Sequence, residues 1–135
     1  MLSSIDAEYS LRRLILQALV CCLSFVGCAH PAEQALQGVW LGEAVENFDE
    51  EEIAAATGWA KGTQFEFKGT RLTVTVPAEA PRTGTYRLSA IEERHVTLTI
   101  LNSQGELSDL ELIVDDAENM RWVLDDGRTM VLKRQ

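Results

Sequence analysis

Side chains that could carry out chemistry are few in this sequence and stand apart from one another. The two histidines, His30 and His95, lie in separate parts of the chain and form no pair at metal-ligand spacing. No serine stands in a G-x-S-x-G turn, and no phosphate-binding or dinucleotide-binding glycine motif occurs. We therefore expect a protein without enzymatic activity, without a cofactor and without a metal site.

Two groups of acidic residues are the remaining candidates for a cation site, because calcium prefers oxygen ligands. Neither group has the D-x-D-x-D-G spacing of a calcium-binding loop. Helix capping explains the first group, and the preference of aspartate for turns explains the second. We expect no specific calcium binding by either group; they comprise Glu43, Glu46, Asp49 and Glu50–Glu52, and Asp115, Asp116 and Glu118.

The N-terminal part of the chain has the order of an export signal. The basic pair Arg12-Arg13 precedes an uncharged, mostly apolar run over residues 14–26, and the run ends at Gly27 and Cys28. Such a signal has an apolar stretch of roughly 7–15 residues and a small residue before its cleavage site. The run is too short to cross a bilayer as a helix, which takes about 20 residues.

The stretch Phe25-Val26-Gly27-Cys28 resembles the lipobox of bacterial lipoproteins. The resemblance implies that residues 1–27 are a signal peptide and that Cys28 becomes the lipidated first residue, which anchors the protein to a membrane. Ala29 is not the aspartate that retains enterobacterial lipoproteins in the inner membrane. By the same resemblance we expect a location at the outer membrane, facing the periplasm.

The mature chain would have no disulfide and a strongly acidic surface. Cys28 is the last cysteine in the sequence, so the domain that follows must be held together by its core. Loss of residues 1–27 removes two basic and two acidic side chains and leaves the net charge at −9. This charge repels phosphate groups, and we therefore expect no nucleic-acid partner.

Apolar residues recur at every second position over most of residues 38–135. This period indicates antiparallel strands with one buried face, and turn residues separate eight such segments. Short connections make sequence neighbours pair, and an eight-stranded meander can bury its edges by closing into an up-and-down barrel. A two-sheet sandwich is the alternative. Residues 28–37 are interpreted as a tether.

One helix is predicted between the first and second strands, over residues 50–57. Asp49 is a suitable N-cap, and Phe48 and Ile53 have the spacing of a hydrophobic staple. Gly58 is expected to end the helix in a left-handed conformation.

The beginning and end of the predicted barrel resemble those of lipocalins. Gly38-Val39-Trp40 has the G-x-W pattern of their first strand, and Lys133-Arg134 lies on the last strand. The resemblance implies that Trp40 and Arg134 seal the closed end of the barrel by a cation–π or stacking contact. The helix then lies at the opposite end, which we expect to be the mouth.

The interior of the barrel leaves two functions open. An eight-stranded barrel is either filled by its own side chains or holds one small ligand. A pocket under the helix would make the protein a binder of a small apolar ligand, whereas a solid core favours a protein-interaction or structural module of the envelope. The expected pocket and lid residues are Tyr86, Trp122, Phe65, Phe67, Trp59 and Phe48.

Overall fold

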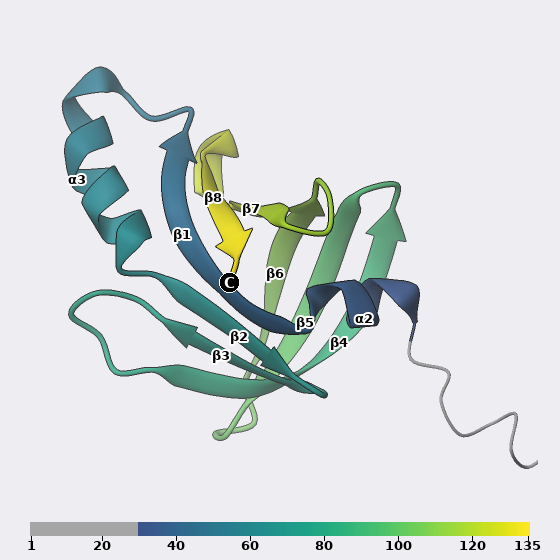
Figure 1. Ribbon diagram of the computed structural model, residues 1–135. Coiled ribbons are helices and arrows are strands. Elements are labelled where there is room, and N and C mark those ends of the chain that lie inside the picture. The colour runs from purple at the N-terminus through teal and green to yellow at the C-terminus, as the bar shows by residue number, and fades with distance from the viewer. Residues whose placement is uncertain (1–29) are drawn as a thin grey trace, which may run out of the picture. The chain divides into compact units, whose positions relative to one another are not determined.

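Eight antiparallel strands close into a barrel in the computed structural model, which describes residues 30–135 (Figure 1). Each strand pairs with its sequence neighbours, and the first pairs with the last. The eight-stranded meander is therefore confirmed, and the two-sheet sandwich is not the fold. The strands are β1 (Gly38–Glu46), β2 (Gln64–Lys68), β3 (Arg71–Thr75), β4 (Arg82–Glu92), β5 (His95–Asn102), β6 (Leu107–Val114), β7 (Asn119–Val123) and β8 (Thr129–Arg134).

The predicted signal peptide and lipidation site lie outside the described residues. Cleavage after residue 27 and lipidation of Cys28 therefore stay predictions. No helix within residues 30–135 is long and apolar enough to cross a membrane.

The half of the barrel nearest Gly38 and Arg134 is filled by large apolar side chains. In this half Trp40 of β1 is paired with Phe65 of β2 and with Arg134 of β8. The inward positions predicted from the alternation supply most of this core. Its buried members are Leu36, Trp40, Ala60, Phe65, Phe67, Leu72, Tyr86, Val96, Leu98, Leu112, Met120, Met130 and Leu132.

The interpretation of residues 28–37 as a tether is wrong for most of its length. Residues Pro31–Leu36 form helix α2, and Leu36 is completely buried in the core. The Trp40 Nε1 donates a hydrogen bond to the Leu36 carbonyl oxygen at 2.9 Å. Pro31 suits the first position of α2, because the N–H that proline lacks would have no partner there in any case.

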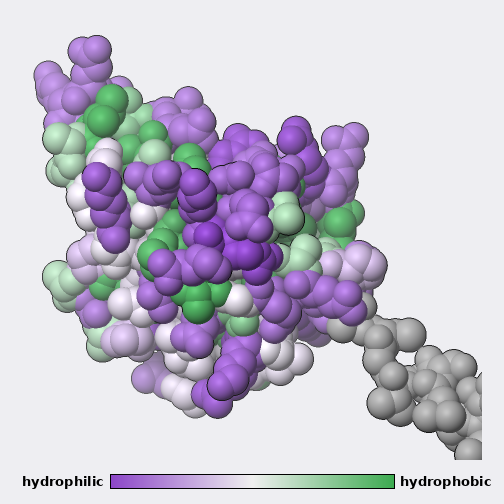
Figure 2. All heavy atoms as spheres, in the orientation of Figure 1, coloured by the Kyte–Doolittle hydropathy of each residue, from purple (hydrophilic) through white to green (hydrophobic). Residues whose placement is uncertain are grey.

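Helix α3 is longer than predicted, because it runs over Glu50–Lys61. Gly58 lies within the helix, and Gly62 is the residue that caps its end. Asp49 is the N-cap, as predicted, although the cap uses its backbone oxygen rather than its side chain. The staple with Ile53 is also absent, since this side chain is 43% exposed, and apolar side chains of α3 are visible at the surface in Figure 2.

Backbone contact holds the end of α3 against β1 (Figure 1). A Cβ atom at Gly42 would lie 1.9 Å from the Ala60 carbonyl oxygen, so only glycine permits this approach. The Gly42 N–H donates to the Thr63 carbonyl oxygen at 2.9 Å, and the Thr63 hydroxyl donates to the Trp59 carbonyl oxygen at 2.9 Å. These contacts fix the backbone position of Trp59, and therefore the point from which its side chain extends.

Candidate functional site

A cavity of about 330 Å³ opens at the end of the barrel opposite α2. The predicted mouth is thus where the structure places a pocket. Its lining comes from α3, from β3 to β7 and from the turn that joins β3 to β4. The lining residues are Trp59, Leu72, Val74, Val76, Glu79, Ala80, Arg82, Thr83, Gly84, Ile100, Asn102, Ser108 and Trp122.

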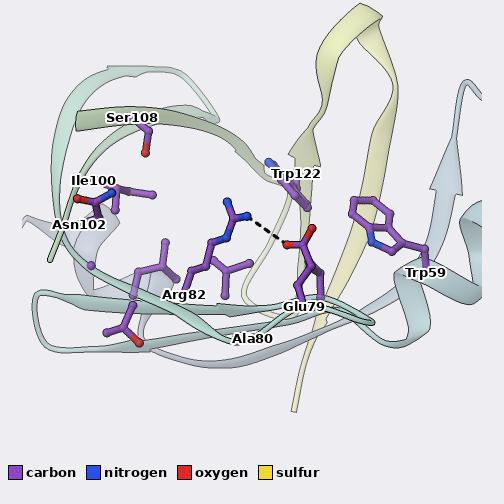
Figure 3. Close-up of a pocket in the computed structure, with 13 residues that line it drawn as sticks. Trp59, Glu79, Ala80, Arg82, Ile100, Asn102, Ser108 and Trp122 are labelled. Carbon is purple, nitrogen blue, oxygen red and sulfur yellow. Dashed lines mark ion pairs between the residues drawn. The ribbon is translucent and has the colours of Figure 1, made fainter. Parts of the chain in front are cut away.

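Two tryptophans form one wall of the cavity (Figure 3). The ring centroids of Trp59 and Trp122 are 5.8 Å apart, and Trp122 in turn lies 5.2 Å from Phe65 in the filled part of the barrel. The Trp59 ring thus lies against Trp122 of strand β7. Aromatic rings at this spacing attract each other beyond the effect of area burial, so the wall is pre-formed.

Polar groups lie along the opposite wall and the rim. The Arg82 guanidinium and the Glu79 carboxylate form an ion pair at 3.4 Å, drawn as a dashed line in Figure 3. Asn102 and Ser108 lie beyond them, on the side away from the two tryptophans (Figure 3). The cavity therefore combines a tryptophan wall with several polar side chains. None of these four polar residues is among the six pocket and lid residues expected from the sequence.

The opposite end of the barrel is closed by α2 and the C-terminal strand. The Arg134 guanidinium lies 4.2 Å from the centroid of the Trp40 ring, so the contact implied by the resemblance is present. The same guanidinium donates hydrogen bonds to the carbonyl oxygens of Ala35 and Gln37. The Gln37 side chain accepts from the Gly69 N–H at 2.8 Å.

Tyr86 belongs to this closed end, not to the pocket as predicted. β3 pairs Arg71 with Thr85, which places Tyr86 beyond the end of β3 beside the β2–β3 turn. Its hydroxyl donates to the Gly69 carbonyl oxygen at 2.9 Å and accepts from Gln37 Nε2 at 2.8 Å. Burial raises the pKa of Tyr86, against the lowering effect of the Gln37 hydrogen bond.

Three other predicted pocket residues do not line the cavity. Phe65 and Phe67 are packed in the filled half of the barrel, because their strand pairs with the first residues of β1. Phe48 follows Asn47, whose positive φ of 63° turns the chain outward after β1. The Phe48 ring consequently lies at the surface, 5.0 Å from the Arg128 guanidinium. Of the six predicted residues, the structure brings only Trp59 and Trp122 to the cavity.

The acidic turn after β6 is a hydrogen-bonded structural element. Asp115 accepts two hydrogen bonds from Arg121, both at 2.9 Å. Backbone hydrogen bonding from Glu118, and then the Asn119 side chain, lower the pKa of Asp116. Within residues 30–135 no three metal-binding side chains lie close enough to hold an ion.

Comparison with known proteins adds a structural likeness. No protein-family model and no curated protein matches the sequence. Among solved structures, a lipocalin-like protein from Bacteroides uniformis is similar, with 10% identity and a TM-score of 0.45. The match covers 75% of this chain and 99% of that chain. The barrel assignment itself rests on the strand order described above.

Proposed function

We propose that this protein is a non-enzymatic lipoprotein of the cell envelope that binds a small apolar ligand in its barrel. The cavity at the α3 end is the observation that carries the proposal. Its volume of about 330 Å³ lies at the lower end of the range of small-molecule sites, about 300–1,000 Å³. A mostly apolar lining with a few polar groups is the usual character of such sites.

The anchor in this proposal is a lipidated Cys28 at the outer membrane, facing the periplasm. Only Ala29 and His30 separate Cys28 from the first residue of α2. The three backbone steps from Cys28 to Pro31 span at most about 11 Å. Because α2 is bonded to the closed end of the barrel, an anchored protein would hold that end at the bilayer and turn the cavity away from it.

The ligand is tested on the full chain carrying Cys28→Ser, which cannot be lipidated. We expect solvent extraction of the purified protein to release a small apolar molecule detectable by mass spectrometry, and an environment-sensitive dye to compete for the same site. Val74→Trp should fill the cavity and abolish both signals. Thr85→Trp, on the exposed outer face of β4, is the matched control and should leave both intact. Absence of any ligand and of dye binding in the parent protein would refute the binding function.

The anchor is tested separately by metabolic labelling with a fatty acid. The wild-type protein should carry the label and fractionate with the outer membrane, and Cys28→Ala should lose both properties. Label that persists in Cys28→Ala would show that the lipid is attached at another residue, and a wild-type protein without label would show that no lipid is attached.

A protein-interaction module is the second candidate, supported by an apolar pair on the outside of the barrel. Leu101 and Leu107 face each other across the β5–β6 hairpin and are 45% and 66% exposed. If the cavity binds nothing, a cross-linked envelope partner that is lost in Leu101→Ser together with Leu107→Ser would favour this function.

A further inference from the structure

We propose that the cavity selects a ligand with a carboxylate head on a small apolar body, and that Arg82 binds the head in place of Glu79. The inference rests on the proposed ligand-binding function and names the class of ligand. It is carried by the charges and hydrogen-bond donors of the cavity wall.

Donors outnumber acceptor-only groups among the polar side chains of the cavity. Arg82 is the only cationic lining residue and Glu79 the only anionic one. The Asn102 Oδ1 already accepts from the N–H groups of Gln104 and Glu106, both at 2.9 Å. Its Nδ2, which can only donate, is therefore the amide atom left for a ligand. Ser108 adds a hydroxyl that points into the cavity (Figure 3).

The ion pair that now occupies Arg82 is a weak one. The Arg82 and Glu79 side chains are 81% and 53% exposed, and their closest N–O distance is 3.4 Å. Exposed pairs of this kind contribute little, because water and salt screen them. Glu79 also lies in a loosely bonded turn, in which its N–H reaches the Val76 carbonyl oxygen only at 3.4 Å. Glu79 can therefore leave Arg82 at little cost.

A carboxylate is the head group that best replaces Glu79. The guanidinium presents parallel N–H donors that match the two oxygens of a carboxylate, so a ligand carboxylate can take the place of the Glu79 carboxylate. The apolar body would then contact apolar residues of the lining, among them Val74, Trp59 and Trp122. The carboxylate head would contact hydrogen-bond donors, and the apolar body would contact apolar side chains.

Three probes of equal chain length separate head-group classes: octanoate, 1-octanol and octylammonium. Their affinities are measured by calorimetry and by tryptophan fluorescence, on the full chain carrying Cys28→Ser. We expect octanoate to bind at least about 5-fold more tightly than 1-octanol, and Arg82→Gln to abolish this preference. Glu79→Gln should raise the affinity for octanoate about 2- to 5-fold, the worth of an exposed ion pair, and leave 1-octanol unchanged. Arg87→Gln, on the exposed outer face of the same strand, controls for the change in net charge.

The outcomes distinguish this inference from the proposed function. Equal binding of octanoate and 1-octanol, unaffected by Arg82→Gln, would refute the carboxylate class and leave an apolar binding site. If octylammonium binds most tightly and this binding is lost in Glu79→Gln, the cavity selects a cationic head group instead of a carboxylate. Failure of all three probes to bind would overturn both the inference and the ligand-binding function.

Discussion

Arg134 lies with its guanidinium 4.2 Å from the centroid of the Trp40 ring, while its N–H groups donate to carbonyl oxygens at the end of α2. One side chain thus joins the buried tryptophan, the last strand and the N-terminal helix. The face of the guanidinium meets the ring and its edge meets the carbonyl groups. An ammonium group cannot do both, because it is a compact point charge without a planar edge.

Arg134→Lys should therefore lower the free energy of unfolding by about 2 kcal/mol, since it loses the planar contact and leaves carbonyl oxygens unsatisfied. Trp40→Ala should cost about 3–5 kcal/mol, the usual range for a buried large aromatic residue. Urea denaturation measures both. Arg87→Lys, at an exposed position, is the control and should change stability by less than about 0.5 kcal/mol.

Leu36→Ala distinguishes a helix that belongs to the domain from a tether. Leu36 is fully buried, so its truncation should cost about 2–5 kcal/mol in a denaturant melt. Gln34→Ala, in the same helix but exposed, should have little effect. Equal stability of the two variants would contradict the packing of α2 against the barrel.

Two glycines of the α3 region should respond oppositely to alanine. Gly42→Ala should destabilise the protein by at least about 2 kcal/mol, because its Cβ would overlap the Ala60 carbonyl group. Gly58→Ala should stabilise it by about 0.5–1 kcal/mol, since Gly58 lies in the helix with open space around it. Loss of stability in Gly58→Ala would instead support the left-handed helix end that the sequence had suggested.

Trp59→Ala should affect ligand affinity more than stability. The side chain is only partly buried, and it supplies half of the tryptophan wall. We expect a loss of dye or ligand affinity of tenfold or more, which is about 1.4 kcal/mol, with a smaller change in unfolding free energy. A denaturant melt and a titration on the same preparation measure the two effects. A large loss of stability would show that Trp59 is a core residue.

Stability should fall at alkaline pH through Tyr86. The folded state raises the pKa of this residue above its usual value of 10.0, so the native protein holds the proton more tightly than the unfolded chain. The resulting stabilisation is complete below about pH 10 and is lost as the pH rises through the folded pKa. Tyr86→Phe should cost about 1 kcal/mol at pH 7 and show a flatter decline above pH 10. Parallel curves of unfolding free energy against pH for the wild-type protein and Tyr86→Phe would contradict a raised pKa of Tyr86 in the folded state.

The barrel could be predicted from the sequence because its alternation is local and repeated. Residues such as Leu72 and Leu98 alternate with polar neighbours, and short turns then force neighbouring strands to pair. The helix α2 was missed because Leu36 is the only large apolar residue in its segment. A single buried side chain produces no periodicity, and the packing around it involves Trp40 of the following strand and Arg134 of the last strand.

The pocket was predicted in position but only partly in its residues. The end of the barrel at which the pocket lies can be predicted, because successive turns of a meander lie at alternate ends. The lining residues depend on the offsets between paired strands, which cannot be read from the sequence. The offset of β3 against β4 moves Tyr86 to the closed end. The same topology brings Arg82, Asn102 and Ser108 to the mouth, although nothing in their local sequence marks them as neighbours.

The backbone contact between Gly42 and Ala60 bears on how fast a ligand could exchange. Because this end of α3 is packed directly against β1, the helix cannot move outward to open the cavity. It is therefore a fixed side of the entrance. The loosely bonded turn 77–81 is the side that can yield. Substitutions there at positions other than Glu79 would change the rates of entry and escape together and leave the equilibrium affinity nearly unchanged, so residence time would be set at the turn and affinity inside the cavity.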